Sequence, residues 1–225
     1  MVGIEEKIDV EISLIESCIQ DFKQNGKSIF LSSSFQSHSI PMLHIFSKID
    51  RSIPVYFVDT GFHFPETIVF CEKISNALDI ELNVVSSNIP KIDLITKENR
   101  FLFTSDPDLC CQLNKVDPIE RVCEQYDVWV TGVRKDQSKV RENFDMIAKG
   151  KKGVTRFHAM LNWDYEMINT YIKMHSLPAH PLEEEGYQSV GCSPCTSKPI
   201  YDDRSGRWIG MNKTECGLHL GVIKN

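Results

Sequence analysis

The 225-residue chain lacks any apolar run of the roughly 20 residues that a membrane-spanning helix needs. Its first residues mix acidic and apolar side chains, and no basic start precedes an apolar core, so no secretory signal peptide is visible. The chain also lacks an excess of positive charge, because 25 Lys and Arg face 31 Asp and Glu. A surface with net charge -6 does not attract nucleic acid or anionic lipid. An anionic ligand would therefore need a local basic pocket.

Internal repeats and low-complexity segments are absent as well, and 41% of the residues are hydrophobic, as in a folded globular protein. We expect one large domain, or one domain with a small appendage, in the cytoplasm. Eight cysteines are present. In a reducing compartment they stay thiols, so clustered cysteines indicate a metal site or redox chemistry rather than a disulfide framework.

The order of predicted elements indicates an α/β fold. Apolar residues at helical spacing predict an amphipathic helix from Ile4 to Phe22 that stops at Asn25 and Gly26. Short apolar runs then alternate with helical stretches. The runs cover 28–34, 53–61, 80–87 and 127–133, and the helical stretches cover 64–78 and 116–126. This alternation predicts a mostly parallel sheet with helices on both faces.

Polar or glycine-containing turns follow three of these runs, as "SSSF", "DTGFHFPE" and "TGVRKDQS". Ligands of open α/β sheets bind at the carboxyl ends of the strands, so we expect these turns to line one site. Beyond residue 140 the pattern changes. We expect a mobile basic connection over 141–158, a helix that Asn162 caps and Pro178 closes, and loops from 181 onward that something other than a core holds.

Two cysteine pairs form the first candidate site. Cys110 and Cys111 are adjacent, and a disulfide between neighbours is strained. Cys192 and Cys195 have CxxC spacing, which lets one turn direct two sulfurs at one metal. Four thiolates in two pairs could close an iron–sulfur cluster, whereas adjacent cysteines fit one tetrahedral zinc poorly. Taken separately, CxxC can also be a zinc half-site or a redox pair, and CC can be two buried apolar residues.

The remaining cysteines divide into two groups. Cys18, Cys71 and Cys123 fall among apolar neighbours in helical stretches, which favours ordinary core packing. Cys216 instead has Lys213 three residues before it and His219 three residues after it. Nearby cations lower the pKa of a thiol and supply the nucleophilic thiolate, so Cys216 is a candidate nucleophile on a mobile tail. An incidental surface thiol is the alternative.

Together the motifs resemble the assimilatory adenylylsulfate and phosphoadenylylsulfate reductases, over about residues 28 to 220. The resemblance rests on "SSSF", "VDTGFHFPET", "CCQLNKVDP", "WVTGVRKDQSKVR", "LPAHPLEEEGYQSVGCSPCT", "RSGRW" and "ECGLH". It implies an adenine nucleotide alpha hydrolase-like fold. It also implies reduction of adenosine 5'-phosphosulfate to sulfite and AMP through an S-sulfocysteine on Cys216, with thioredoxin or glutaredoxin as the electron donor. The paired cysteines resemble those of the adenylylsulfate enzymes, which hold one 4Fe-4S cluster.

The resemblance also implies roles for individual residues. The cluster ligands would be Cys110, Cys111, Cys192 and Cys195. The substrate-binding residues would be Ser32, Ser33, Ser34, Phe35, Lys115, Gly132, Arg134, Arg141, Arg204, Arg207 and His219. Residues 1–190 would form the nucleotide-binding domain, with Cys110 and Cys111 inside it. Residues 191–225 would add the cluster-binding loop and the catalytic tail as part of that domain.

Several positions depart from the family pattern. Gln36 stands where glycine is common, and an acidic pair found in many adenylylsulfate enzymes is missing. Asn114 stands where arginine is frequent, and the span from Cys195 to "RSGRW" is short. Reduction of phosphoadenylylsulfate, giving adenosine 3',5'-bisphosphate, therefore stays an alternative. A zinc-holding scaffold and an ATP-pyrophosphatase-like adenylating enzyme are further alternatives. A homo-oligomer would be unsurprising for such a fold, but nothing in the sequence requires one.

Overall fold

A six-stranded sheet forms the centre of the computed structural model, which describes residues 3–96, 99–201, 204–211, 213 and 215–219. The strands lie in the order β3-β2-β1-β4-β6-β5, and only the edge strand β5 is antiparallel to its neighbour. Their bounds are β1 Ile29–Ser32, β2 Val55–Asp59, β3 Leu82–Ser86, β4 Val128–Thr131, β5 Ile147–Lys149 and β6 Thr155–His158. The predicted mostly parallel α/β sheet is confirmed.

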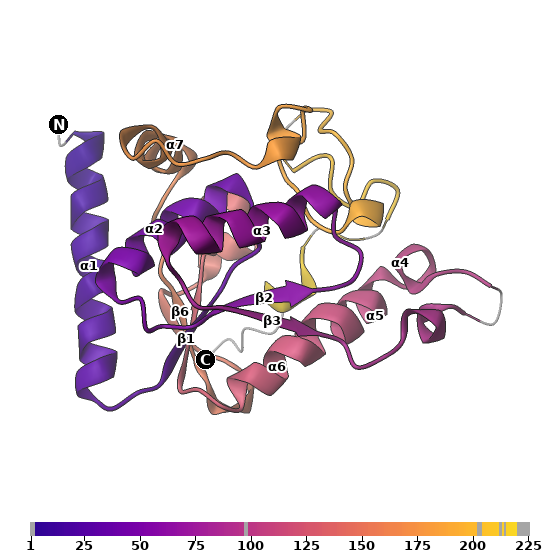
Figure 1. The fold of residues 1–225 in the computed structure, drawn as a ribbon, viewed down its shortest axis with the longest axis horizontal. Coiled ribbons are helices and arrows are strands. Elements are labelled where there is room, and N and C mark those ends of the chain that lie inside the picture. The colour runs from indigo at the N-terminus through magenta and orange to yellow at the C-terminus, as the bar shows by residue number, and fades with distance from the viewer. Residues whose placement is uncertain (1–2, 97–98, 202–203, 212, 214, 220–225) are drawn as a thin grey trace.

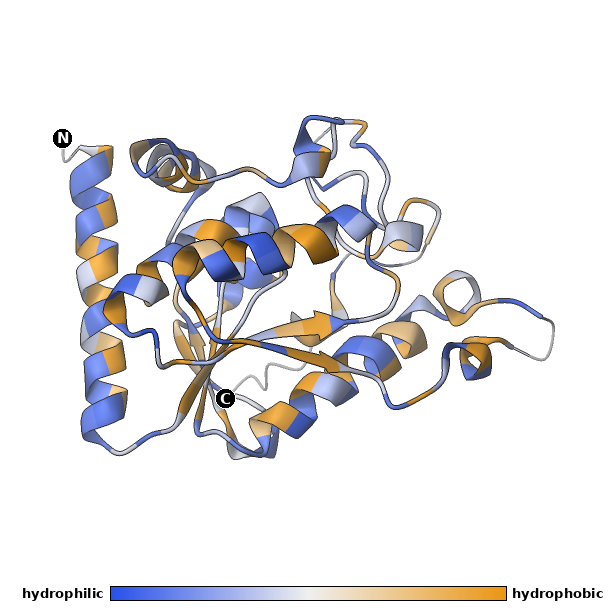
Figure 2. Ribbon diagram, viewed as in Figure 1, coloured by the Kyte–Doolittle hydropathy of each residue, from blue (hydrophilic) through white to orange (hydrophobic). Residues whose placement is uncertain are grey.

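Helices cover both faces of this sheet (Figure 1). One face carries α1 Ile4–Gln24, α2 Ile40–Ile49, α3 Pro65–Leu78 and α7 Tyr165–Met174, and α6 Asp117–Cys123 covers the other. The short helices α4 Leu102–Ser105 and α5 Pro107–Cys111 precede α6. Figure 2 shows the apolar residues of α1 on the side that faces the rest of the protein, as the helical spacing predicts.

The strands divide their side chains between two cores because successive strand residues point to opposite faces. In β1, Ile29 and Leu31 pack into the core beneath α1, α2, α3 and α7, whereas Phe30 packs into the core beneath α6. In β4, Val130 faces the first core and Trp129 the second. Burial on both faces explains why these strands read as continuous apolar runs.

The prediction for residues 141–158 is wrong. This segment contains β5 and β6, and β6 joins the sheet beside β4, where Phe157 is fully buried. Lys151 and Lys152, which suggested a mobile connection, occupy only the turn between the two strands. The strands are too short to show a clear period, so pairing with β4 rather than local sequence decides their structure.

Two helices also differ from prediction. Asp164, not Asn162, caps α7, because its carboxylate accepts a hydrogen bond from Met167 N at 2.8 Å. The sequence reading missed α2, whose residues are buried almost all round and therefore show no polar face. Beyond α7 the described residues form only 3-10 turns and loops, as expected. None of the described helices has the length and apolar character to cross a membrane.

Candidate functional site: a cationic cavity beside four cysteines

A cavity of about 840 Å³ opens where β1, β2 and β4 end. It therefore lies at the carboxyl edge of the parallel strands, where the turn sequences predicted a site. The residues predicted for catalysis or substrate binding that line it are Ser32, Ser33, Ser34, Lys115, Gly132, Arg134, Arg141, Arg204, Arg207 and Cys216. The structure brings these residues together from segments spread over most of the chain.

Two predicted residues are not placed at the cavity. Phe35 is fully buried in the core and packs edge-on against Phe57, with ring centroids 5.9 Å apart. Its backbone has a positive φ of 53°, and its N–H donates to Ser33 Oγ at 3.1 Å. Phe35 therefore supports the turn after β1 from the core and does not face the cavity. The side chain of His219 lies outside the part of the chain that the structure describes.

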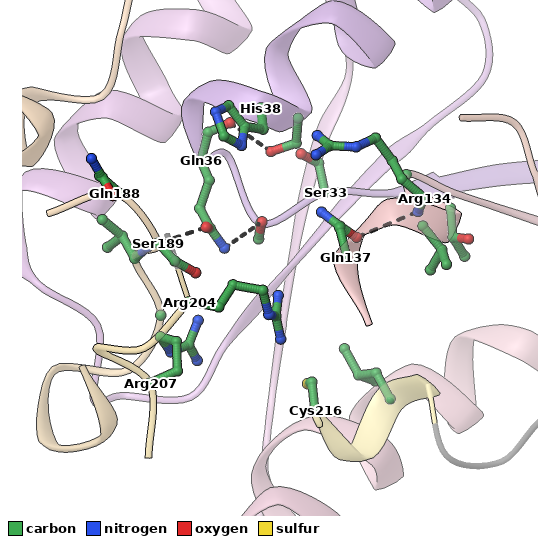
Figure 3. A pocket seen from close by; sticks show the side chains of 18 of the residues that line it. Ser33, Gln36, His38, Arg134, Gln137, Gln188, Ser189, Arg204, Arg207 and Cys216 are labelled. Atoms are coloured by element: carbon green, nitrogen blue, oxygen red, sulfur yellow. Dashed lines mark hydrogen bonds between the residues drawn. The ribbon is translucent and has the colours of Figure 1, made fainter. Parts of the chain in front are cut away.

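One end of the cavity is formed by neutral hydrogen-bonding groups of the turn after β1. Gln36 connects this turn to the loop before the CxxC pair, because its Nε2 donates to Ser34 Oγ at 3.3 Å and its Oε1 accepts from Val190 N at 3.1 Å (Figure 3). His38 lies edge-on to Tyr165, with centroids 5.5 Å apart. Gln36 thus has a bridging role, in place of the glycine that is common at this position.

The other end is cationic. Lys115, Arg204, Arg207 and Lys213 line it, and Figure 3 shows Arg204 and Arg207 between the turn after β1 and Cys216. Burial, reinforced by repulsion from Arg141, lowers the pKa of Arg204 to about 10. Arg207 Nε is buried and has no hydrogen-bond partner among the described residues. An anionic ligand would satisfy the Arg207 Nε donor.

The loop that carries these arginines is held against the CxxC turn. Ser197 N donates to the carbonyl of Gly206 at 2.7 Å, and Thr196 pairs with Arg207 in an isolated β-bridge. A Cβ atom on Gly206 would lie 2.0 Å from the carbonyl oxygen of Ser197. Only glycine therefore allows this close approach, which accounts for the glycine in "RSGRW".

Arg134 and Arg141 are already paired with carboxylates. Arg134 donates to Asp136 at 2.9 and 3.0 Å. Arg141 donates to Glu215 at 2.6 and 2.9 Å, and both of these side chains are buried. The sequence reading assigned no role to Glu215, although it directly precedes Cys216. Its position beside the candidate nucleophile is the only signal the sequence offers.

The four paired cysteines line a second, small cavity of about 20 Å³. Cys110 and Cys111 end α5, where a π-helical turn over Gln112–Val116 follows, and Cys192 and Cys195 flank a 3-10 turn. Thus two pairs separated by 80 residues in the chain face one space. Lys115 lines both this small cavity and the large one.

Polar groups surround the cysteine cavity. Asn114 Nδ2 donates to the carbonyl oxygen of Cys110 at 2.9 Å and lies 3.7 Å from its sulfur. Thr60 Oγ1 lies 3.2 Å from Cys192 Sγ, within hydrogen-bonding distance. Asn114, which departs from the family pattern, therefore helps to fix the helical turn that carries the adjacent pair.

The electrostatic interactions place Lys115 among thiols. Burial acts to lower the pKa of Lys115, but Cys192, Cys216 and Cys111 outweigh burial and raise it. In turn, burial acts to raise the pKa of Cys192, whereas Lys115 and a hydrogen bond with Thr60 lower it. Lys115 therefore stays a cation between the cysteine cavity and Cys216.

The segment around Cys216 is packed into this region. Leu218 contacts the core beneath α6. A Cβ on Gly217 would lie 3.3 Å from Cys111 Cβ, so glycine lets the chain pass close to the adjacent cysteine pair. Lys213 forms an ion pair with Asp108 at the start of α5. The candidate nucleophile is thus held beside Lys115 at the mouth of the cationic end.

Among the described residues, no three or more His, Cys, Asp or Glu side chains are placed to hold a single metal ion. All four paired cysteines nevertheless line the same small cavity. Burial raises the pKa of Cys110 and of Cys195 to about 11, so both are thiols unless a bound cation takes their charge. This donor set suits a group with several metal atoms better than one ion.

Comparison with known proteins gives one consistent result. The model of the phosphoadenosine phosphosulfate reductase domain matches residues 28–198. The chain is 37% identical over 213 residues to the adenosine 5'-phosphosulfate reductase of Chelativorans sp., covering 92% of this chain and 85% of the relative. It is 32% identical over 202 residues to adenosine 5'-phosphosulfate reductase 2 of Bacillus subtilis, covering 88% and 86%.

Solved structures show the same fold. The phosphoadenylyl-sulfate reductase of Candida auris superposes with a TM-score of 0.66 at 22% identity, covering 83% of this chain and 94% of that one. The FMN adenylyltransferase of Candida glabrata superposes with a TM-score of 0.63 at 16% identity, covering 99% and 80%. Both share the mostly parallel α/β sheet of this chain.

Proposed function

We propose that this chain, which belongs to the phosphoadenosine phosphosulfate reductase family, reduces adenosine 5'-phosphosulfate to sulfite and AMP. One observation carries the proposal. Cys216 lines the same cavity as four cationic side chains and the hydrogen-bonding turn after β1. A nucleotide phosphosulfate matches both ends of this cavity. Its anionic phosphosulfate suits the cationic end, and its neutral nucleoside suits the hydrogen-bonding end.

Cys216 is the nucleophile of the reaction. Its thiolate attacks the sulfur of the phosphosulfate, a new S–S bond forms, and the bond from that sulfur to the bridging oxygen breaks. AMP leaves with the electron pair of the broken bond. The sulfonate stays on Cys216 as an S-sulfocysteine.

A reduced dithiol protein, thioredoxin or glutaredoxin, completes the turnover. One of its thiolates attacks Cys216 Sγ, a mixed disulfide between the donor and Cys216 forms, and sulfite leaves with the electron pair of the broken S–S bond. The second thiol of the donor then resolves the mixed disulfide. The donor becomes a disulfide, Cys216 returns to a thiolate, and two electrons have passed to the sulfur that leaves as sulfite. This donor is reduced in the cytoplasm, where we place the reaction.

The cations at one end of the cavity reduce the repulsion between the Cys216 thiolate and the sulfonate of the substrate. A thiolate and a sulfonate repel each other, and the chain as a whole is acidic. Lys115, Arg204 and Arg207 collect positive charge where both anions must approach. Arginine offers planar two-point contacts to oxyanions, and the orphaned Arg207 Nε is one such donor.

The four paired cysteines fit one 4Fe-4S cluster. Cys110 and Cys111 would each ligate one iron, and Cys192 and Cys195 the other two. A bound cluster would tie α5 to the CxxC turn and shape the electrostatic field beside Lys115. The hydrogen bonds from Asn114 and Thr60 orient the two turns that supply the thiolates. In the same proposal, residues 1–190 bind the nucleotide, and 191–225 supply the CxxC pair and the catalytic cysteine.

The charge distribution favours adenosine 5'-phosphosulfate over its 3'-phosphorylated form. The neutral end offers serines, Gln36 and His38, and Asp136 pairs with the Nε and Nη2 of Arg134, so that only the Nη1 of this guanidinium has no partner among the described residues. The remaining positive charge is concentrated at the end that holds Cys216. A 3'-phosphate would be a second anionic group without a matching cluster of cations.

A sulfite-release assay tests this proposal. The anaerobically purified protein is mixed with reduced thioredoxin and with either nucleotide, with or without the 3'-phosphate. We expect sulfite and AMP from adenosine 5'-phosphosulfate and a brown protein that absorbs near 400 nm. Preference for the 3'-phosphorylated nucleotide would overturn the substrate assignment. A colourless zinc protein, or pyrophosphate release from ATP without sulfite, would overturn the reductase itself.

A further inference from the structure

The carboxylate of Glu215 is saturated by groups of the large cavity. Its Oε2 accepts from Arg141 Nε at 2.9 Å and from Ser138 Oγ at 3.0 Å. Its Oε1 accepts from Arg141 Nη2 at 2.6 Å and from the backbone N–H of Cys216 at 2.8 Å, with Arg204 Nη2 at 3.5 Å. The carboxylate therefore connects the backbone at Cys216 to the loop after β4.

Arg141 has little capacity left for a ligand in this arrangement. Its Nε and Nη2 donate to Glu215, and its Nη1 donates to Gln137 Oε1. The side chains of Arg141 and Glu215 are only 5% and 2% exposed, so this is a buried ion pair rather than a surface contact. Removal of one partner from such a pair leaves an uncompensated buried charge, which is strongly unfavourable.

The other contacts of this segment are spaced around Cys216. Lys213 pairs with Asp108, and Leu218 packs against the core beneath α6. Among the described residues, Glu215 is the one whose side chain bonds directly to the backbone of Cys216. Its ion pair thus has the position needed to fix the direction of the Cys216 side chain relative to Lys115.

We infer that Glu215 is a positioning residue, and that its ion pair with Arg141 docks the segment carrying Cys216 into the cavity with the sulfur beside Lys115. In this role Arg141 acts through Glu215 and not on the nucleotide, which differs from the substrate-binding role that the family resemblance implied. The effect on catalysis rests on the proposed function. The docking itself does not.

The first test measures docking without any substrate. Iodoacetamide labelling of Cys216 is followed by peptide mass spectrometry in the wild type, in Glu215→Gln and in Arg141→Gln. Each variant breaks the buried pair, so we expect Cys216 to be labelled about 100-fold faster in both. Glu142→Gln is the matched control, because Glu142 is exposed and adjacent to Arg141, and its labelling rate should equal that of the wild type. An unchanged labelling rate in Glu215→Gln overturns the inference.

The second test measures the chemical step. In a single turnover with saturating adenosine 5'-phosphosulfate, S-sulfocysteine formation should slow about 100-fold in both variants. AMP affinity should stay within about twofold of the wild type, which also shows that the variants are folded. If Arg141→Gln weakens AMP binding by about tenfold or more and leaves Cys216 labelling unchanged, Arg141 is a nucleotide ligand and the inference is wrong.

A double variant sharpens both tests. Arg141→Gln with Glu215→Gln removes both charges of the buried pair, so the increase in the Cys216 labelling rate should be no larger than in the single variants, rather than the product of their separate effects. Increases that multiply in the double variant count against the ion pair. If the wild type forms no S-sulfocysteine while the labelling results hold, the proposed function fails and the docking role stands.

Discussion

The sheet and the segment after α7 are stabilised by different kinds of interaction. The sheet packs between two apolar cores that contain nearly all the large buried hydrophobic residues. The later segment contributes few such residues, chiefly Leu182, Val190 and Trp208. It is held by close backbone approaches, by the buried carboxylate of Glu215 and by thiols that face α5. The first region therefore folds by apolar burial, and the second depends on buried charge and close backbone contacts.

In the proposed reaction the nucleophile, Cys216, lies in the second region, so its loss should have the largest effect. Cys216→Ser should lower sulfite release at least about 1,000-fold, because a serine hydroxyl is a poor nucleophile at neutral pH. AMP binding and the absorption near 400 nm should not change. Cys18→Ser is the control, since Cys18 is a half-buried residue of α1 far from the cavity, and its activity should match the wild type. Sulfite release by Cys216→Ser would remove this residue from the mechanism.

Loss of a proposed cluster ligand should destabilise the second region and leave the sheet intact. In Cys111→Ser, we expect most of the iron to be lost and amide hydrogen exchange to rise across 188–218, while β1 and β4 stay protected. Cys71→Ser is the opposite case. Cys71 is buried in α3 within the apolar core, so this variant should lose about 1–3 kcal/mol of unfolding free energy and keep its iron. Full iron content in Cys111→Ser would contradict the ligand assignment.

A cavity in the core should affect the sheet and leave the cysteines in place. Ile15 of α1 is fully buried against the sheet, and Ile15→Ala should lower the free energy of unfolding by about 2–5 kcal/mol in urea denaturation. Val10 lies on the same helix but is 61% exposed. Val10→Ala should therefore change the free energy of unfolding by less than about 0.5 kcal/mol. Equal losses in the two variants would show that α1 is not stabilised by its buried face.

A buried histidine predicts how stability depends on pH. Burial, with repulsion from Arg156 and Arg141, lowers the pKa of His158 to about 4. The unfolded chain binds a proton near pH 6.5, so folding is favoured fully above that pH and less favoured as the pH falls toward 4. The difference is at most about 3 kcal/mol.

Comparison with His158→Asn isolates this contribution. Histidines 44, 63 and 180 also have lowered pKa values, chiefly through burial, and they contribute with the same sign to both proteins. The unfolding free energy of the wild type should therefore rise more steeply between pH 4.5 and 6.5 than that of the variant. Equal slopes would show that His158 titrates normally in the folded protein.

The sequence predicted the elements whose signal is local. The first four strands, α1, α3 and α6 were recognised because their apolar spacing follows from which faces are buried. The sequence did not predict β6 or α2. β6 is formed by pairing with a neighbouring strand and α2 is buried almost all round, so neither shows a regular alternation of apolar and polar residues. Among the site residues, the cysteine pairs were proposed from their spacing, and the cations from the resemblance to the reductase family. Glu215 was missed because a carboxylate beside a cysteine has no meaning until its partner is known.

The sequence by itself determined the alternation of strands and helices, the two cysteine pairs and a thiol near the end with basic neighbours. Each of these is a local pattern of residues close together in the chain. Only the tertiary structure decided which charges meet. Lys115 reaches both the four cysteines and Cys216, and Arg141 is neutralised by a carboxylate 74 residues away. The physical reason is that a charge acts over a few ångströms, and distances between distant segments are set by packing of the whole chain.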